Sequence, residues 1–430
     1  MNATPEAQAL AVAERLLRPE AVLAAVPRPE AASLAHGLAG TALLHARLAT
    51  VDPVFLTAAG SHWAAAASHA RRHRAVGAGI FTTGGGLAAS LIIGTGYLPT
   101  PADRQAPTAR AAAWLSRQAQ CIADNLAQRR RAGDPYTRRA AYDAINGLAG
   151  IGRVLLAAVT ADLPAAEPGL IAALEALTTM IVSPHGSLPG WWLPASMHPS
   201  TVKTDPSGSA TTGMAHGIAG PLAFLAAAFA RSWAVPGQNA AIRHASGWLL
   251  DWKADGTWQW PTSVSGAELA AGVARPVGRQ DALAAGVARP VGRQDAWCYG
   301  TPGISAALAL ASRALRDDAF GHASDAAIAS LGGRPARTWD ADGPTLCHGH
   351  AGVLQCAASH PDVAAEAASV ITTAFDADRP FAIPHTDNGA IYDHPGFLTG
   401  AAGTALALAE RGRLPSPAVP DRWDCVLLLS

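Results

Sequence analysis

Two cysteines and one histidine in this sequence have the types and the placement to bind a metal ion. Cys347 and His348 stand side by side in TLCHGHAG, and Cys298 has the equivalent place in WCYGTPG, two residues before a glycine in both cases. Two thiolates and an imidazole can form a three-ligand zinc set, and catalytic zinc sites commonly keep a fourth position free for water or substrate. There is no CxxC pair, and buried cysteines are normally inert packing, so a purely structural role for these thiols is the alternative interpretation.

Other polar side chains precede similar glycines in segments that are otherwise apolar. His216 and Tyr299 each come directly before such a glycine, and Asp143 lies four residues before another. A histidine near a carboxylate can transfer protons at neutral pH. Ordinary helix capping is the competing interpretation. The twin segments AHGLAG and AHGIAG also leave His36 and His216 indistinguishable by sequence.

These residues belong to a signature that recurs along the whole sequence: a glycine, two residues, a small residue or glycine, and then an Ala/Leu-rich run. The first glycines of successive copies are 49 to 83 residues apart, which is the spacing of a helical pair with its loops. A glycine at a helix start permits a tight turn and the close approach of neighbouring helices. The seven copies begin at Gly37, Gly86, Gly147, Gly217, Gly300, Gly349 and Gly400.

The signature predicts an all-α fold in which inner buried helices alternate with outer amphipathic ones. The Ala/Leu runs are apolar nearly all round, as expected of a helix that is buried on every side. The stretches 106–131 and 240–252 are more polar and suit an outer layer. If seven such pairs close into a ring, the polar residues before the glycines converge on one face. An open solenoid is the alternative, although neither end of the sequence resembles a polar cap.

Three segments depart from this pattern. Residues 269–282 are repeated without change at 283–296, a 14-residue tandem duplication that we interpret as a loop insertion of low entropic cost. The stretch 183–212 is rich in Pro, Gly, Ser and Trp, and we expect an irregular excursion over the mouth of the ring, with short strands. The segment 384–396 carries two histidines and two aspartates, which we interpret as rim hydrogen bonders or a peptide-contact loop.

Composition excludes some classes of function. The 430 residues carry 32 basic and 32 acidic side chains, and this balance argues against a nucleic-acid partner. The beginning of the sequence lacks the apolar region of a secretory signal. The apolar run Thr211–Ala230 contains a histidine and a proline, so we predict a buried helix and no integral membrane segment. Five cysteines, an odd number, fit a cytoplasmic protein better than a disulfide framework.

The motifs WCYGTPG, CHGHAG, AHGIAGPLA and PGFLTGAAGTALAL resemble those of the lanthionine synthetase C-like cyclases. The resemblance covers all seven repeats, and it implies that residues 1–430 form a single α/α toroid domain of seven inner and seven outer helices, with one zinc ion at its mouth. Bacterial members of the family form the thioether rings of lanthipeptides. The chain is similar to the stand-alone cyclases, because no dehydratase, lyase or kinase segment accompanies the repeats.

The resemblance also implies a role for individual residues. Cys298, Cys347 and His348 match the zinc ligands of the family. The match assigns the general acid/base to His216, with Asp143 near it, and the active-site tyrosine to Tyr299. An arginine of the family precedes WCYG; here the nearest is Arg293, although the duplication places Arg279 in an identical context.

The expected substrate is therefore a dehydrated precursor peptide, whose cysteine thiols add to dehydroalanine or dehydrobutyrine. A separate dehydratase and an exporter are the expected partners, with the protein in the cytoplasm or peripherally associated with a membrane-bound biosynthetic complex. Two other functions stay open. A different α/α-toroid enzyme, such as a carbohydrate-processing one, would require a pair of catalytic carboxylates, and only Asp143 is well placed. A non-catalytic protein could bind or scaffold a modified peptide.

Overall fold

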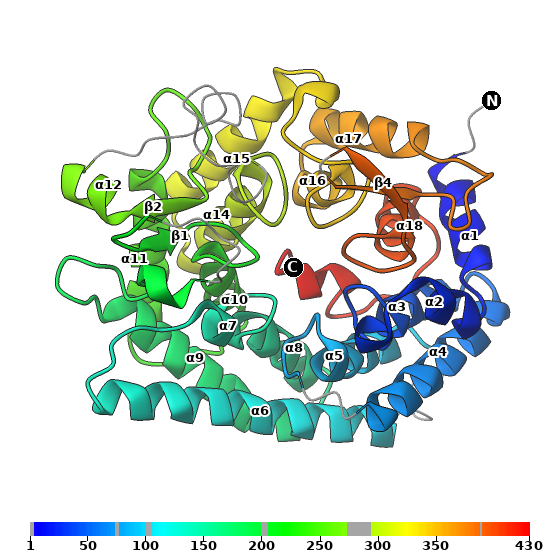
Figure 1. Cartoon of the computed structure of the whole chain (residues 1–430), viewed down its shortest axis with the longest axis horizontal. Helices are drawn as coiled ribbons and strands as arrows, with labels where there is room; N and C mark the ends of the chain where they lie inside the picture. Colours follow the sequence, from blue (N-terminus) through cyan, green and yellow to red (C-terminus); the bar gives the residue numbers. More distant parts are fainter. Residues whose placement is uncertain (1–3, 74–76, 100–104, 199–204, 273–293, 388) are drawn as a thin grey trace.

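Six of the seven glycine signatures begin just before helices that line the inside of a ring (Figure 1). The exception is Gly86, which lies inside its helix because that helix already begins at Thr83. The computed structural model describes residues 4–73, 77–99, 105–198, 205–272, 294–387 and 389–430. Within these residues the inner helices number seven: α3 (Leu38–Leu48), α5 (Thr83–Thr95), α8 (Leu148–Thr160), α10 (Ala219–Ala230), α14 (Thr301–Leu315), α16 (His350–Cys356) and α18 (Ala401–Arg411).

An outer helix packs against each inner helix. In the order of their inner partners, beginning with α3, the described outer helices are α4 (Pro53–Arg72), α6 (Gln105–Arg131), α9 (Glu167–Val182), α11 (Gln238–Asp251), α15 (Asp318–Gly332), α17 (Pro361–Thr373) and α1 (Pro5–Arg15). Each inner helix also contacts the next one around the ring, and α18 contacts α3. The ring is therefore closed, and the open solenoid is excluded.

Burial distinguishes the two layers as the sequence predicts. The inner helix α10 buries ten of its 12 residues, whereas the outer helix α6 buries five of its 27. The stretches predicted to be outer helices, 106–131 and 240–252, correspond to α6 and α11. The apolar run Thr211–Ala230 contains the buried helix α10, as predicted, but that helix begins only at Ala219 because β1 and a turn precede it.

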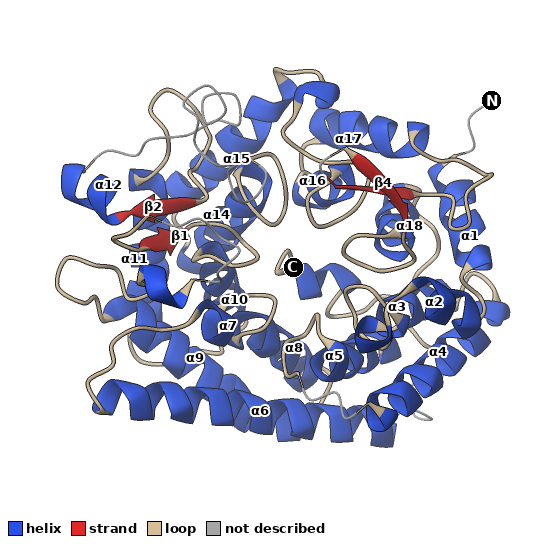
Figure 2. Cartoon of the chain, in the orientation of Figure 1, coloured by secondary structure: helices blue, strands red, loops and turns tan. Residues whose placement is uncertain are grey.

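The remaining elements are short, and helices dominate the molecule (Figure 2). Two antiparallel pairs of strands are described: β1 (Ser209–Thr211) with β2 (Ser263–Ser265), and β3 (Pro384–Asp387) with β4 (Ala390–Asp393). The first pair confirms the short strands expected in the excursion after residue 183. The minor helices are α2 (Pro19–Ala25), α7 (Arg139–Tyr142), α12 (Gly266–Ala271) and the 3-10 turns η1 (Arg28–Glu30), η3 (Pro164–Ala166), η4 (Ala195–Met197), η5 (Ala336–Thr338) and η6 (Trp423–Leu427).

Main-chain hydrogen bonds join the turns that precede the inner helices. In six of the seven turns, one residue donates its N–H to the carbonyl of the corresponding residue in another repeat, and we name this set the main-chain ring. Among the described residues no such bond links Phe81 to Ala144. The main-chain ring surrounds the end of the toroid that we call the mouth. The bonds run from Ala144 to Ala215 (3.1 Å), Ala215 to Cys298 (3.1 Å), Cys298 to Cys347 (3.1 Å), Cys347 to Leu398 (2.9 Å), Leu398 to Ala35 (2.9 Å) and Ala35 to Phe81 (3.2 Å).

The seam of the toroid differs from a simple repetition of inner and outer helices. Helix α1 comes first in the sequence but packs outside the last inner helix, α18. Two buried histidines fasten the end of α1 to the first helical pair: Nε2 of His45 contacts the Leu16 carbonyl at 2.9 Å, and Nε2 of His62 contacts the Leu17 carbonyl at 3.3 Å. The ring is thus closed by its first and last helices.

The end of the chain lies inside the ring, as Figure 1 shows. The turn η6 is buried and contacts the inner helices α5 and α8. The indole N–H of Trp297 donates to the Leu427 carbonyl at 2.8 Å, and the fully buried Arg153 donates to the Ser430 carbonyl at 2.8 Å. This segment therefore fills the centre of the toroid beneath the mouth.

One helical stretch among the described residues, Pro164–Val182, is long and apolar enough to cross a membrane by length and composition alone. Half of that stretch is buried inside the protein. Core helices of soluble proteins pass the same test, so the finding is weak evidence for a membrane span.

The histidine seam predicts a loss of stability in mild acid. Burial, and secondarily the neighbouring His62, lowers the pKa of His45 from 6.5 to about 3. The unfolded chain takes up this proton near pH 6.5 and the folded protein does so only near pH 3. The stability that depends on the neutral ring is therefore complete above pH 6.5 and is lost as the pH falls toward 3, by at most about 1.4 kcal/mol per pH unit.

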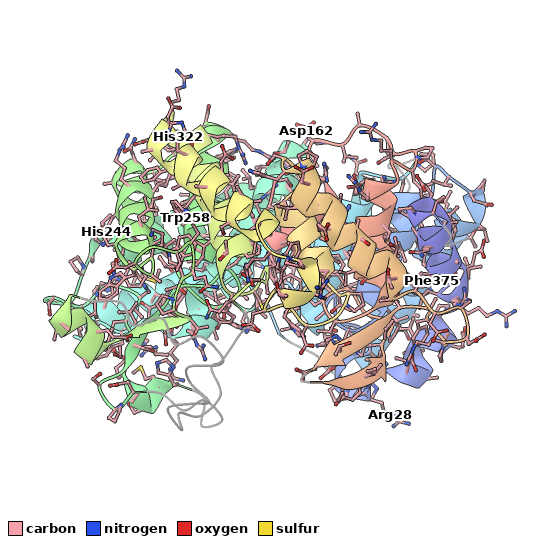
Figure 3. All side chains as sticks on the ribbon, turned by 90° about the horizontal axis from the view of Figure 1, so that it is seen from above. Arg28, Asp162, His244, Trp258, His322 and Phe375 are labelled. Atoms are coloured by element: carbon pink, nitrogen blue, oxygen red, sulfur yellow. The ribbon has the colours of Figure 1, made fainter. Side chains whose placement is uncertain are left out.

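We expect the His45→Gln variant, which retains a donor for the Leu16 carbonyl, to show a shallower decline in unfolding free energy between pH 7 and 4.5. Urea unfolding at a series of pH values measures this decline. The control is His322→Gln, at an exposed position of α15 on the outside of the molecule (Figure 3), which should retain the wild-type slope. An unchanged slope in His45→Gln would refute the assignment.

Candidate metal centre and active site

The main-chain ring brings the two predicted cysteine ligands together. Cys298 and Cys347 precede different inner helices, α14 and α16, but they are bonded partners in the ring through the Cys298 N–H and the Cys347 carbonyl. The sulfur atoms of both cysteines and a ring nitrogen of His348 all lie within 4.8 Å of one another. Three residues that the sequence separates into two repeats thus form one cluster.

The cluster has the chemistry of a metal site. Cys298 is buried, and Cys347 and His348 are half-buried. Nε2 of His348 is buried and has no hydrogen-bond partner among the described residues. A buried polar atom without a partner is costly unless something else satisfies it. Two thiols and an imidazole that has an unpartnered nitrogen are suited to bind a soft or borderline cation such as zinc.

The charges in the cluster favour an ionised thiol at Cys347. A hydrogen bond between the two thiols lowers the pKa of Cys347 and raises that of Cys298. Burial alone would lower the pKa of His348, but the hydrogen bond to the Cys347 sulfur and its charge outweigh burial and raise it. These shifts favour the ionised form of the Cys347 thiol, and a thiolate is the form that binds metals.

His216 and Asp143 form a second pair at the same mouth. Nδ1 of His216 lies 2.7 Å from Oδ2 of Asp143, and the Asp143 side chain is 2% exposed. The other oxygen of Asp143 accepts the N–H groups of Asn146 (2.7 Å) and Gly147 (3.0 Å), which lie in the turn before α8. The helix α8 has no side-chain cap, so Asp143 orders this turn and is not the helix cap that the competing interpretation supposed. The pair is held by the ring bond from Ala144 to Ala215.

Tyr299 connects the two groups. It follows Cys298 directly, and its ring centroid is 6.4 Å from that of His216. Burial raises the pKa of Tyr299, so the phenol keeps its proton at neutral pH and can donate a hydrogen bond. The charge of His216 in turn contributes to the lowered pKa of Cys347. The metal cluster and the His216–Asp143 pair thus belong to one site.

The contacts of His36 differ from those of its sequence twin. Nδ1 of His36 meets the Thr399 hydroxyl at 3.1 Å, and its carboxylate neighbour, Glu30, is 4.0 Å away. His216 is therefore the histidine that has a close, buried carboxylate. The rim histidines His385 and His394 pack against His348 and His36, at ring-centroid distances of 5.2 and 5.1 Å. Burial, together with the neighbouring histidines, lowers the pKa of each to about 4.

The predictions for the active-site arginine and for the three remaining cysteines complete the comparison with the sequence. The predicted arginine, Arg293, and its duplicate Arg279 lie outside the described residues. The other cysteines are free thiols, as expected: Cys121 is exposed, Cys356 is half-buried and Cys425 is buried.

Sequence reasoning missed Arg139. This residue begins the short helix α7, one turn before Asp143, and its side chain is half-buried. Its positive charge opposes the rise in the pKa of Tyr299 and contributes to the lowered pKa of His198, so it lies close to both. No hydrogen bond or ion pair of the guanidinium is found within the described part of the chain. One signal was present in the sequence: Arg139 comes four residues before Asp143, about one helical turn away.

Comparisons with known proteins agree with this geometry. The model of the family described as "Lanthionine synthetase C-like protein" matches residues 28–421. A solved structure described as nisin cyclase superposes with a TM-score of 0.72 over 93% of each chain, at 19% sequence identity. At this identity the match shows a shared fold and confirms the α/α toroid. No curated protein sequence matches the chain.

The conformation and close packing of the turn before α14 leave no room for a side chain at Gly300. Its φ is +91°, and a Cβ there would lie 1.8 Å from the Gln294 carbonyl oxygen. We expect Gly300→Ala to destabilise the protein by clearly more than Gly133→Ala, whose φ is +84° but whose surroundings are open. The control should lose only the strain of a positive φ, roughly 1–2 kcal/mol. Thermal unfolding compares the two; equal losses would show that the turn before α14 can relax.

Proposed function

Because the family model covers most of it, the chain belongs to the lanthionine synthetase C-like family, and we propose that it is a zinc-dependent lanthipeptide cyclase. In the proposed reaction, cysteine thiols of a dehydrated precursor peptide add to dehydroalanine or dehydrobutyrine in the same peptide. Each addition forms one carbon–sulfur bond and leaves a lanthionine or methyllanthionine ring. No atom is lost or gained.

One observation carries the proposal: a Cys₂His cluster and a histidine–carboxylate pair lie at the same mouth. The addition requires a thiolate as nucleophile and a proton for the α-carbon of the alkene. Either cluster alone would have many interpretations. Together they supply both requirements of a thiol addition.

Cys298, Cys347 and His348 would hold one zinc ion per chain. When bound, the ion would favour the ionised, nucleophilic form of a substrate thiol. The three residues provide the ligands and hold them in a largely buried position, where competition from water is reduced.

His216 would move the proton. Its Nδ1–H donates to Asp143, so Nε2 is the nitrogen available to the peptide. Nε2 can accept the proton that the thiol releases and return it to the α-carbon after the π bond breaks. The buried Asp143 orients the ring and stabilises the imidazolium that exists between these two events.

Negative charge develops on the carbonyl oxygen of the dehydrated residue during the addition. Tyr299 can donate a hydrogen bond to that oxygen, and the guanidinium of Arg139 is a nearby cation. Preorganised donors of this kind stabilise a developing oxyanion strongly in a site with little water. Arg293, which the family resemblance suggests for this role, stays a second candidate.

The proposal implies a place in a reaction sequence. We propose that residues 1–430 act as one domain, that a separate dehydratase supplies the peptide and an exporter removes the product, and that the cyclase works in the cytoplasm. A non-catalytic peptide-binding protein stays the alternative, and it would retain peptide binding without consumption of thiols.

The central experiment measures zinc and thiols together. We expect the wild-type protein to contain about one zinc per chain by elemental analysis, and Cys347→Ala to lose most of it because one thiolate ligand is missing. With a synthetic peptide that carries one dehydroalanine and one cysteine, the wild type should consume the free thiol without a change in mass. Alkylation followed by mass spectrometry counts the remaining thiols.

Cys121→Ala is the matched control, since Cys121 is exposed and outside the cluster. It should retain both zinc and activity. A wild-type protein that holds no zinc, or that cyclises equally well after its zinc is removed, would overturn the proposed function.

The assignment of Arg139 has its own test. We expect Arg139→Gln to lower kcat for cyclisation by about 10²-fold, as is typical when one oxyanion donor is removed, with zinc content unchanged. Arg138→Gln changes the neighbouring arginine, which is exposed, and should have little effect. Equal activity in the two variants would exclude Arg139 from the site and favour Arg293.

A further inference from the structure

An ion pair between a buried carboxylate and a partly exposed arginine lies beside the cysteine cluster and takes no part in the proposed chemistry. Asp295 is fully buried, and Nη2 of Arg334 donates to both of its carboxylate oxygens at 3.0 Å. Burial raises the pKa of Asp295, and the positive charge of Arg334 opposes that rise. A buried carboxylate needs such a partner, because an unpaired charge in the interior is strongly destabilising.

The ion pair is part of a junction between two loops. Asp295 also accepts the N–H of Asp340 at 2.8 Å through Oδ2, and its own N–H donates to the Asp340 carbonyl at 3.2 Å. The N–H of Gln294 donates to the Asp340 carboxylate at 3.1 Å. We name this set of contacts among Gln294, Asp295, Arg334 and Asp340 the clamp.

The two clamped loops are those that carry the cysteines. Asp295 lies three residues before Cys298, and Asp340 lies seven residues before Cys347. The main-chain bond from Cys298 to Cys347 joins the same loops a second time. Two separate points of attachment between two segments fix both their distance and their relative rotation, whereas a single bond would leave rotation free.

We propose that Asp295 and Arg334 are positioning residues that hold the Cys298 thiol in register with Cys347 and His348 for metal binding. Neither residue is assigned as a ligand. The inference rests on the proposed zinc function, since it concerns the same three ligands. Groups that orient metal ligands in this way commonly affect affinity by tenfold or more when they are removed.

The clamp also explains how a duplication is tolerated next to a metal ligand. The second copy ends at Ala296, two residues before Cys298, and the clamp holds the last residues of that copy. Gln294 and Asp295, the described residues of that copy closest to Cys298 in the clamp, are therefore held by contacts that do not depend on the length of chain before them. Deletion of one copy, residues 269–282, should leave metal affinity unchanged.

The test uses metal binding as its readout. Zinc affinity is measured by competition with a chromophoric chelator, and the ligand geometry by the absorption spectrum of the cobalt-substituted full-length protein. We expect Arg334→Gln to weaken zinc binding about tenfold and to alter the cobalt spectrum, with Arg334→Lys intermediate because it keeps the charge. The control is Arg243→Gln, which breaks an exposed ion pair with Asp317 far from the cluster.

Each outcome has a distinct meaning. A folded Arg334→Gln protein with wild-type affinity and spectrum would overturn the clamp while leaving the proposed function intact. If Arg334→Gln fails to fold, Arg334→Lys and the double variant Asp295→Asn/Arg334→Gln, which removes both charges, are judged by the same two measurements. A wild-type protein that binds neither zinc nor cobalt would refute the proposed function itself.

Discussion

The main-chain ring is the constraint on which the rest of the site depends. Its six hydrogen bonds connect turns of different repeats, including the last repeat with the first through Leu398 and Ala35, and they set corresponding residues side by side. Cys298 and Cys347 are bonded partners in this ring, although they precede different inner helices. The residues that flank ring members, Asp143 before Ala144 and His216 after Ala215, become neighbours in the same way. The geometry of the site is thus inherited from the closure of the toroid and does not depend on local sequence.

This dependence explains how much the sequence could predict. The spacing of seven glycine signatures indicates helical pairs, the apolar runs indicate which helix of each pair is buried, and closure places the polar residues on one face. The cluster of Cys298, Cys347 and His348 follows from their shared position relative to the signature, and the structure brings the three together. No element of this inference requires knowledge of contacts between side chains, because periodicity and position carry it.

Features that depend on contacts between distant side chains could not be predicted. The segments around His36 and His216 are nearly identical, and only the residue that another repeat places beside each ring distinguishes them: Thr399 for His36, Asp143 for His216. Asp295 occurs in a duplicated QDA triplet, so the sequence offers two equivalent aspartates. The copy that precedes Trp297 is paired with Arg334. The seam was missed as well, because nothing local to α1 shows that it packs outside the last inner helix.

The ring also shows why one arc of the mouth can hold all of this chemistry. Its bonds join main-chain N–H and carbonyl groups, so closure of the toroid makes no demand on the side chains at the ring positions. Those positions hold alanine, phenylalanine and leucine as well as the two cysteines.

Reactive side chains can therefore occupy consecutive positions on one arc of the ring without loss of the main-chain bonds that join the turns. They do require further contacts that set their orientation. The bonds of Asp143 to the turn before α8 and the clamp at Asp295 each supply such contacts with groups outside the ring. Different groups therefore determine the fold and the geometry of the site. The main-chain bonds determine which residues are neighbours, and the buried carboxylates determine how the side chains of these residues are oriented.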